Sequence, residues 1–508
     1  MRLNCGVDVS KISALRDDLA AAAFTVDALG SLWGPDAAAA LHRGHRVPAR
    51  RALARAGGGG RLGTLATLFV LGLPVGRESL DTALPRSGSA AAVGLGLVRI
   101  DGETAIPLLD LRPYSFVDAI GPGAWWIASD LGETALGGAI PEHHVLGVGG
   151  ASTTLSGLMV PRPVESALDL GTGCGIQALH ASRHARHVVA TDISQCALDL
   201  AAFNAALNNV TTIEFRLGSL FEPVAGERFD LIVSNPPFVI TPRTEGVPAY
   251  EYRDGGLIGD ALVEQVVREA ANHLAADGIA QLLGNWEYGA EDGLDRVAGW
   301  LEESPLDAWV IEREVQDAAL YAETWIRDGG TTPSSPDFDR LASAWLDDFD
   351  TRRVTSVGFG YVTLRASGAA RPLRRFERLD GAIGRNEAGL GAHLLACLDA
   401  HDAVVALSDA ALAHTRLIVA GDVTEERHYW PGDEHPTVMD LRQGGGFGRT
   451  FALGTALAAV VGACDGDLPL GVICSAIAEL LEVDERELLA EVLPGVRGLV
   501  ETGVLGIA

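Results

Sequence analysis

The feature that most constrains this fold is a glycine-rich turn between a short apolar stretch and a helix-forming stretch. The segment Ala167–Ile176 reads Ala-Leu-Asp-Leu-Gly-Thr-Gly-Cys-Gly-Ile. In an open α/β sheet such a turn lies at the carboxyl end of the first strand, where glycine lets the backbone approach a ligand closely. Asp169 precedes the glycines, and a carboxylate suits a positive amino group better than a pyrophosphate. Taken alone, the motif also fits a nucleotide-binding turn or a simple tight turn.

Strand and helix patterns alternate across residues 150–367, with helical stretches such as Gln195–Leu207 and Asp260–Ala275 between apolar segments. This alternation predicts an α/β fold with a doubly wound, mostly parallel sheet. The aromatic-rich stretch near 315–353 is too long for an ordinary loop and predicts a helical insertion. The predicted strands are Ala167–Leu170, His187–Ala190, Thr212–Arg216, Leu231–Ser234, Ile279–Leu283, Trp309–Glu312 and Val357–Leu364.

The two flanking regions have patterns of their own. Residues 1–149 contain several helical stretches and then an alternating segment centred on Asp101-Gly102, which is a hairpin signal. We therefore predict an N-terminal winged-helix-like recognition domain there. Residues 368–508 end in amphipathic helical stretches, and we predict a second winged-helix-like domain for that region.

Composition limits the possible partners and location. The chain has 508 residues, of which 48% are hydrophobic and 21% are charged, as in ordinary globular proteins. Its 67 acidic and 39 basic residues give a net charge of −28, which argues against a protein wrapped in nucleic acid. No apolar run reaches the roughly 20 residues of a membrane helix. Since the N-terminus also lacks a signal-peptide pattern, we expect a cytoplasmic protein without membrane contact.

We predict no metal site. The adjacent pair His143-His144 has no second pair of ligands at a matching spacing. The cysteines are scattered without a Cys-x-x-Cys pair and are typical of reduced thiols. They are Cys5, Cys174, Cys196, Cys397, Cys464 and Cys474.

A second acidic residue follows the glycine turn at the end of the next predicted strand. This strand, Val188–Asp192, ends in Asp192 about 20 residues after the turn, a position from which a carboxylate can accept both ribose hydroxyls of a nucleoside. Nicotinamide-dependent enzymes share this feature. Asp192 could instead cap the helix that begins near Gln195.

The most specific motif is Asn-Pro-Pro-Phe, directly after the apolar strand Phe229–Ser234. The two prolines stiffen the turn and fix the side-chain carbonyl of Asn235 and the backbone carbonyl of Pro236. Two such acceptors can hold an NH₂ group with its lone pair aimed at a methyl donor, while Phe238 covers a planar substrate. The simpler alternative is a proline turn that only closes the strand.

Together, these motifs resemble the class I S-adenosylmethionine-dependent N-methyltransferases of the Asn-Pro-Pro-(Tyr/Phe) group, over roughly Leu158–Ser367. The resemblance implies methyl transfer to a planar or amide nitrogen, either of a protein glutamine or of an exocyclic amine in RNA. It implies that the acceptor nitrogen is positioned by Asn235, Pro236, Pro237 and Phe238. It further implies that S-adenosylmethionine is bound by Asp169, Gly171, Thr172, Gly173, Gly175, Ile176, Asp192, Ile193, Ser219, Leu220 and Asn235.

Two further segments are similar to the branch that methylates glutamine in release factors. Met159–Glu165 contains Pro-Arg-Pro ahead of the glycine turn, and Arg253–Asp260 contains an acidic residue and a glycine pair. The spacer helix that usually follows Pro-Arg-Pro is missing. Gly218–Phe221 also has Ser219 where the branch has an acid, and a hydroxyl binds an adenine amine more weakly than a carboxylate does.

An arginine-rich stretch without a single acid suggests an RNA partner. In a chain of net charge −28 it fits either a phosphate-facing patch or a solvated helix face. Its members are Arg43, Arg46, Arg50, Arg51, Arg55 and Arg61.

Two other functions compete with methyl transfer. A non-catalytic nucleic-acid-binding protein on a degenerate methyltransferase fold is the alternative of a different class. A nicotinamide-dependent dehydrogenase is disfavoured, because Gly171, Gly173 and Gly175 alternate instead of following the Gly-x-Gly-x-x-Gly spacing.

Overall fold

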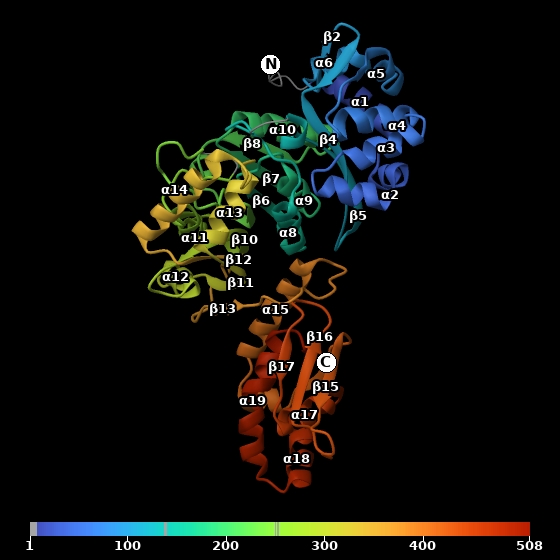
Figure 1. Ribbon diagram of the computed structural model, residues 1–508. Coiled ribbons are helices and arrows are strands. Elements are labelled where there is room, and N and C mark those ends of the chain that lie inside the picture. Colours follow the sequence, from blue (N-terminus) through green and yellow to red (C-terminus); the bar gives the residue numbers. More distant parts are fainter. Residues whose placement is uncertain (1–7, 137–139, 249, 251–252) are drawn as a thin grey trace. The chain divides into compact units, whose positions relative to one another are not determined.

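The computed structural model describes residues 8–136, 140–248, 250 and 253–508 (Figure 1). Cys5, named above among the reduced thiols, lies outside the described residues. The described residues form two compact units. The larger holds most of the chain up to Arg378, and the smaller holds Leu379–Ala508 with the short segments Val117–Gly121 and Gly157–Pro161.

A mixed sheet forms the centre of the larger unit, with the strand order β13-β11-β12-β10-β9-β6-β7-β8. Neighbours from β8 to β10 run parallel, and β12 runs antiparallel to β10 and β11. The predicted doubly wound, mostly parallel α/β sheet is confirmed. Its strands are β6 (Val164–Leu170), β7 (Ala185–Asp192), β8 (Ile213–Leu217), β9 (Phe229–Ser234), β10 (Leu274–Tyr288), β11 (Asp307–Asp317), β12 (Ser356–Arg365) and β13 (Arg374–Arg378).

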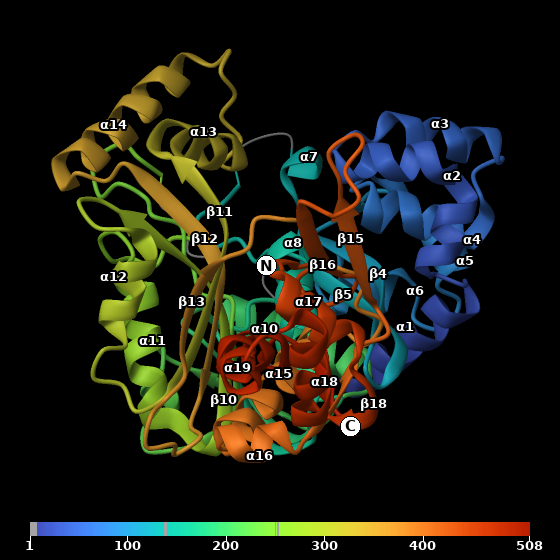
Figure 2. The same ribbon diagram turned by 90° about the horizontal axis from the view of Figure 1, so that it is seen from below.

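Helices cover both faces of this sheet. On one face lie α9 (Ile176–Ala181) and α10 (Gln195–Leu207), and on the other lie α11 (Ala261–His273) and α12 (Gly293–Trp300). Figure 2 shows α11 and α12 next to each other, and both contact β10. Leu168 of β6 packs in the apolar cluster that includes α11, since alternate strand residues point to opposite faces.

Two helices are inserted between β11 and β12, within the stretch predicted to hold a helical insertion. They are α13 (Ala318–Asp328) and α14 (Pro336–Arg352), and they pack on each other beside the ends of those strands (Figure 2). Side chains at helical spacing, Tyr321, Trp345 and Phe349, form their buried core. Shorter helical segments are α7 (Glu133–Leu136), the 3₁₀ turn Glu222–Val224 and α8 (Gly150–Leu158), whose last two residues belong to the smaller unit.

The N-terminal region consists of helices followed by the hairpin expected at Asp101-Gly102. Strands β1 (Val75–Gly76), β2 (Val98–Asp101) and β3 (Thr104–Pro107) pair in the order β1-β3-β2. The winged-helix-like character of this region stays a prediction. Its helices are α1 (Val9–Ala21), α2 (Val26–His42), α3 (Val47–Arg55), α4 (Gly60–Leu65), a π-helical turn (Ala66–Val70), α5 (Arg77–Ala83) and α6 (Gly88–Gly94).

This region does not stand apart from the central sheet as the boundary at residue 149 predicts. A long hairpin, β4 (Leu109–Asp118) and β5 (Gly121–Asp130), lies against α10. The buried amide of Asn204 accepts from the Ala128 nitrogen at 2.8 Å and donates to the Ala128 oxygen at 2.9 Å. One continuous apolar cluster also joins the N-terminal helices to α9 and α10. These contacts place both regions in one unit.

The central sheet also extends past the predicted boundary at residue 367. Strand β13 pairs in parallel with β11, and the Arg378 Nε lies 2.7 Å from the Oε1 of the buried Glu312. Arg378 therefore has a structural role at the edge of the sheet.

The smaller unit has its own apolar core, formed mainly by helices. The winged-helix-like prediction for residues 368–508 stays a prediction. None of the helices in the described part of the chain combines the length and apolarity that a bilayer crossing requires. The elements of the smaller unit are α15 (Leu390–Val405), α16 (Asp409–Ala413), β14 (Arg416–Val419), β15 (Val423–His428), β16 (Val438–Gln443), β17 (Thr450–Ala452), α17 (Thr455–Gly462), β18 (Asp465–Pro469), α18 (Leu470–Leu481), α19 (Glu485–Glu501) and β19 (Leu505–Ile507).

Candidate active site

The glycine turn lies between β6 and α9 and is open on its outer side. Gly171, Gly173 and Gly175 have φ values of 76°, 55° and 86°, which favour glycine. A Cβ atom at Gly171 or Gly173 would meet no atom within 4 Å. At Gly175 it would lie 2.9 Å from the Cβ of Ala201 in α10. The first two glycines therefore leave room for a ligand, and the third permits close helix packing.

Asp169 is fully buried beneath this turn. Its Oδ2 accepts from the Thr172 hydroxyl at 2.6 Å and from the Ala178 nitrogen at 2.8 Å. Its Oδ1 has no hydrogen-bond partner among the described residues. Burial raises the pKa of Asp169 to about 7, and the nearby charge of Asp192 adds to this shift. An unpaired buried oxygen is costly, and the Oδ1 of Asp169 could accept a hydrogen bond from a ligand.

Two of the predicted cofactor residues have structural side chains. The Thr172 hydroxyl holds Asp169, and the side chain of Ile176 packs in the apolar cluster with α10. Only the backbone atoms of Thr172 and Ile176 can therefore contact a ligand that lies over the turn.

Asp192, at the end of β7, links the glycine turn to the start of α10. Its Oδ2 accepts from the Gly173 nitrogen at 2.9 Å, and its Oδ1 accepts from the Ser194 nitrogen at 2.8 Å. The N-cap position of α10 belongs to Ser194. A carboxylate has acceptor positions beyond these two bonds, so the geometry is compatible with binding of ribose hydroxyls.

Exposed apolar side chains follow Asp192 along the edge of the sheet that is formed by the carboxyl ends of β6, β7 and β8. Ile193 is 69% exposed and Leu217, at the end of β8, is 55% exposed. Ser219 and Leu220 follow, and Leu220 has a φ of 44°, an uncommon conformation for leucine that its packing against the core maintains. Backbone strain of this kind is concentrated at binding sites. The edge thus offers an apolar surface to a flat ring.

The Asn-Pro-Pro-Phe turn stands beside the glycine turn. The Ser234 hydroxyl, at the end of β9, donates to the backbone oxygen of Leu170 at 2.8 Å. The next residue, Asn235, has a buried Oδ1 without a hydrogen-bond partner in the described part of the chain. Pro236 is buried, Pro237 and Phe238 are partly buried, and Phe238 forms an isolated bridge with Asp254.

The inserted helices reach this same edge. Strand β10 pairs Leu282 with Ser234, so its last residues extend beyond the carboxyl end of β9. There the hydroxyl of the buried Tyr321, in α13, accepts from the Ile240 nitrogen and from the Asn285 Nδ2, both at 2.9 Å. The rings of Phe238 and Trp325 lie edge to face with centroids 6.3 Å apart.

The segment that resembles the glutamine branch also lies against the Asn-Pro-Pro-Phe turn. The Val239 nitrogen donates to the Arg253 oxygen at 2.8 Å. Arg253 is buried, and its Nη1 donates to the Trp325 oxygen at 2.8 Å and to Asp328 at 2.9 Å. Asp254 pairs with Arg243.

The sequence did not single out Tyr321, Asn285 or Trp325 as site residues, and the only available signal was the aromatic content of the insertion.

Thiol chemistry has little support at the glycine turn. Burial raises the pKa of Cys174, within the glycine turn, to about 12, which disfavours the reactive thiolate form. Within residues 8–136, 140–248, 250 and 253–508, no group of three or more His, Cys, Asp or Glu residues is placed to hold a metal ion.

The edge therefore combines two kinds of recognition. On one side an unpaired carboxylate oxygen, an open glycine turn and an apolar wall fit a positively charged nucleoside-like ligand. On the other side an unpaired amide oxygen and aromatic rings fit a planar group that carries N–H donors.

Two family models match separate parts of the chain. The family model described as the methyltransferase small domain matches residues 148–304, which contain the glycine turn and the Asn-Pro-Pro-Phe turn. A second model, described as a domain of unknown function, matches residues 21–108 in the N-terminal region.

Several relatives are similar over the central region. A Methanocaldococcus jannaschii protein named as a protein N5-glutamine methyltransferase is 33% identical over 26% of this chain and 68% of its own length. A ribosomal protein uL3 glutamine methyltransferase of Bradyrhizobium diazoefficiens is 34% identical over 28% of this chain and 46% of its own. A release factor glutamine methyltransferase of Xylella fastidiosa is 40% identical over 24% of this chain and 47% of its own length. The chain thus spans under half the length of the last two relatives.

Proposed function

Since the chain belongs to the S-adenosylmethionine-dependent N-methyltransferases of the release factor glutamine methyltransferase type, we propose that it methylates a glutamine side chain of a protein. The observation that carries this proposal is the unpaired Oδ1 of Asn235 beside the open glycine turn. An amide NH₂ group supplies the hydrogen that this oxygen lacks.

The cofactor fits the residues of the glycine-turn side. We propose that Asp169 faces its amino group, that Gly171 and Gly173 line its methionine part, and that Asp192 accepts its ribose hydroxyls. Ile193, Leu217, Ser219 and Leu220 would contact its adenine ring. When bound, S-adenosylmethionine supplies an electrophilic methyl group on a positively charged sulfur.

The contribution of the protein to catalysis is mainly positioning. An amide nitrogen is a weak nucleophile, because its lone pair is delocalised into the carbonyl group. Acceptance of its two N–H groups by the Asn235 Oδ1 and the Pro236 oxygen would fix the amide plane and aim the nitrogen at the methyl group. Phe238 would cover the amide face. Methylation would replace one N–H hydrogen of the amide, and the released proton would pass to water, so no strong general base is needed.

The direct test is transfer of label to an acceptor. The protein is incubated with methyl-labelled S-adenosylmethionine and a cell lysate, which is then separated into protein, RNA and small-molecule fractions. We expect label in protein, and mass spectrometry of the labelled peptide should place the added methyl group on a glutamine side chain. Label in RNA or small molecules alone would refute the glutamine assignment.

A non-catalytic nucleic-acid-binding protein on a degenerate fold is not supported. The relatives named above are methyltransferases, and the acidic residues, the glycines and the Asn-Pro-Pro-Phe turn are all present in this chain.

We further propose that the N-terminal region contacts RNA while the enzyme acts on a protein. Arg46 is used internally, since its Nη1 donates to the Leu71 oxygen at 3.1 Å. The other five arginines are exposed and form no ion pair within the described residues: Arg43, Arg50, Arg51, Arg55 and Arg61. Unpaired arginines on an otherwise acidic protein fit a phosphate backbone. A cytoplasmic location stays a prediction.

Salt-dependent binding tests this RNA contact. The double variant Arg50→Ala/Arg51→Ala should weaken binding of a structured RNA and reduce the salt slope by about 1–2. The control is Arg77→Ala/Arg99→Ala, which removes exposed arginines that are already paired with Asp81 and Asp101. Equal effects of the two double variants, or wild-type protein that binds no RNA, would refute the contact.

A further inference from the structure

The insertion α13–α14 builds a wall of the proposed acceptor site. Val239 and Ile240, directly after the Asn-Pro-Pro-Phe turn, share one apolar cluster with Tyr321, Trp345 and Phe349 of the insertion. The Tyr321 hydroxyl also accepts the Ile240 N–H, across 81 positions of sequence. Any group held by the Asn-Pro-Pro-Phe turn is therefore close to residues of α13.

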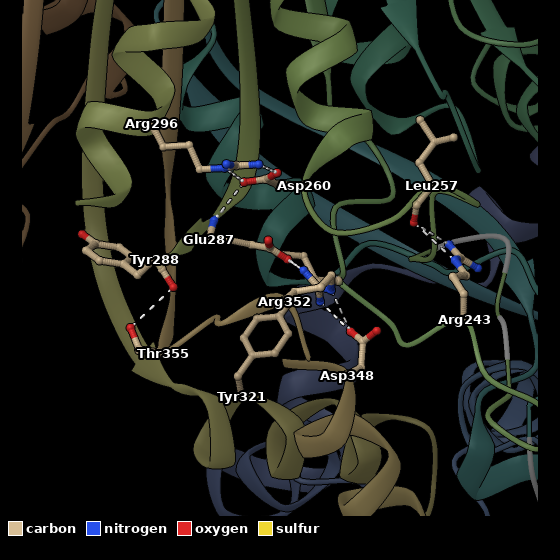
Figure 3. Close-up of polar contacts among 11 residues, drawn as sticks. Arg243, Leu257, Asp260, Glu287, Tyr288, Arg296, Tyr321, Asp348, Arg352 and Thr355 are labelled. Atoms are coloured by element: carbon tan, nitrogen blue, oxygen red, sulfur yellow. Dashed lines mark hydrogen bonds and ion pairs between the residues drawn. The ribbon is translucent and has the colours of Figure 1, made fainter. Parts of the chain in front are cut away.

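Ion pairs fix this wall to the central sheet (Figure 3). Arg352, at the end of α14, pairs with Glu287 of β10 and with Asp348. The Glu287 nitrogen in turn donates to the Asp260 Oδ2 at 2.9 Å, and Arg296 of α12 holds both oxygens of Asp260 at 2.7 Å. Such paired, partly buried charges give the wall a defined position.

Within this wall, Trp325 has a side-chain nitrogen without a hydrogen-bond partner. Its indole Nε1 is buried and has no hydrogen-bond partner among the described residues. Leaving a buried donor unpaired is energetically costly. The ring meets Phe238 edge to face at 6.3 Å, and Arg253 fixes the Trp325 backbone by donating to its oxygen at 2.8 Å.

Two of the unpaired atoms near this turn, the Asn235 Oδ1 and the Trp325 Nε1, are complementary to one chemical group. Asn235 presents an acceptor without a donor, and Trp325 presents a donor without an acceptor. A primary amide has an NH₂ group and a carbonyl oxygen side by side in one plane, so it satisfies both atoms. A simple amine would leave the indole N–H unpaired, which is an effective basis for rejecting it.

We propose that Trp325 determines specificity for a primary carboxamide, by donating its indole N–H to the carbonyl oxygen of the group whose nitrogen Asn235 holds. Phe238 and Trp325 form the aromatic slot around that amide. This assignment rests on the proposed function and adds the residue that reads the carbonyl oxygen. Arg253 is a positioning residue, since it acts through Trp325.

Kinetics on a minimal amide test the assignment. The probe is N-acetylglutamine N-methylamide, with methyl-labelled S-adenosylmethionine. Trp325→Phe keeps an aromatic ring and removes the N–H, so we expect KM for the probe to rise about tenfold with little change in kcat or in cofactor affinity. The control Trp33→Phe makes the same change in the buried core of the N-terminal helices, a cluster that does not include Phe238, and should leave KM unchanged.

A spectroscopic measurement reports the hydrogen bond directly. The indole N–H resonance of Trp325 is identified as the signal missing from Trp325→Phe, in protein loaded with S-adenosylhomocysteine so that no turnover occurs. Adding the glutamine probe should shift this resonance downfield. N-acetylglutamate N-methylamide, which carries a carboxylate in place of the amide, should leave it nearly unmoved.

The outcomes separate this inference from the proposed function. If the wild-type enzyme methylates the probe, but Trp325→Phe has an unchanged KM and the resonance does not move, the role of Trp325 is refuted and the proposed function stands. If neither the probe nor any protein glutamine is methylated, the proposed function falls and the assignment of Trp325 falls with it.

Discussion

The two halves of the candidate active site are built in different ways. The half proposed for the cofactor consists of residues close in sequence, since Gly173 and Asp192 are 19 positions apart. The half proposed for the acceptor joins the Asn-Pro-Pro-Phe turn to an insertion much later in the chain, with 81 positions between Ile240 and Tyr321.

This difference distinguishes the residues that the fold needs to bind its cofactor from the residues that adapt the site to one substrate. The cofactor half depends on backbone conformations that only glycine adopts easily, so its sequence tolerates little change. The acceptor half depends on aromatic packing and ion pairs, which many sequences can supply. Substrate choice is therefore expected to reside in the acceptor half, because function belongs to the site and not to the fold.

The largest expected effect tests the cofactor half. Gly173→Val should lower S-adenosylmethionine affinity by more than about 3 kcal/mol, because the branched side chain disfavours the left-handed turn and occupies the ligand space. Calorimetric titration measures this loss. Binding is the readout of choice, because turnover of this variant would be limited by the missing cofactor.

The matched control for that variant is Gly226→Val. Gly226 has a φ of 80°, and a Cβ atom placed there would meet no atom within 4 Å, as at Gly173, but Gly226 lies in the turn before β9. The strain should be similar, while cofactor affinity should be retained. Equal loss of affinity in both variants would mean that instability, and not ligand contact, explains the first result.

The cofactor half could be predicted from sequence because its rules are local. A strand, three alternating glycines and a helix fix the backbone path, and Asp192 at the next strand end follows from parallel pairing. The sequence did not reveal that Thr172 and Ile176 have structural side chains, because that depends on which way each one turns within the fold.

The acceptor half is tested by Asn235→Ala, the second largest effect. If Asn235 holds the acceptor nitrogen mainly as it aligns with the methyl group, its removal should cost about 2–3 kcal/mol in barrier, on the order of a hundredfold in kcat. Cofactor affinity should hardly change. Loss of cofactor binding with intact turnover at saturating cofactor would contradict this role.

Conservative variants sharpen the result. Asn235→Asp keeps two acceptor oxygens and should retain more activity than Asn235→Ala. Phe238→Tyr should be tolerated if the ring only covers the acceptor, whereas Phe238→Ala should raise the acceptor KM.

A smaller effect is expected for the carboxylate at the end of β7. Asp192→Ala should weaken cofactor binding by about 1–3 kcal/mol through lost hydrogen bonds to a charged group. The control is Asp230→Ala, since the Asp230 Oδ2 likewise accepts from a backbone nitrogen, that of Ser166 at 2.9 Å, but at the amino end of β9. Calorimetry should show unchanged cofactor affinity for the control.

The acceptor half and the domain boundaries depend on contacts between distant segments. The aromatic residues of the insertion indicated buried helices, but nothing in their spacing showed that Trp325 would meet Phe238. Likewise, the sequence could not show that Asn204 of α10 binds Ala128 of β5 and so merges two predicted domains. A polar residue in a helix gives no sign of its partner when that partner is a backbone group on another element.

The smallest expected effect on cofactor affinity concerns the protonation of Asp169. Its pKa of about 7 in the folded protein lies above the ordinary 3.8, so the folded state holds the proton more tightly than the unfolded state does. This group should therefore destabilise the cofactor-free protein increasingly as pH rises from about 4 to about 7.

Cofactor affinity should change in the opposite direction, because only the charged carboxylate pairs with an ammonium group. Between pH 6 and 7 its charged fraction grows from roughly 10% to 50%, so affinity should increase about fivefold. Urea unfolding and calorimetry on wild type and Asp169→Asn measure both trends, and both should be absent from the variant. Parallel pH profiles in the two proteins would remove Asp169 from the cofactor half and leave the acceptor half unaffected.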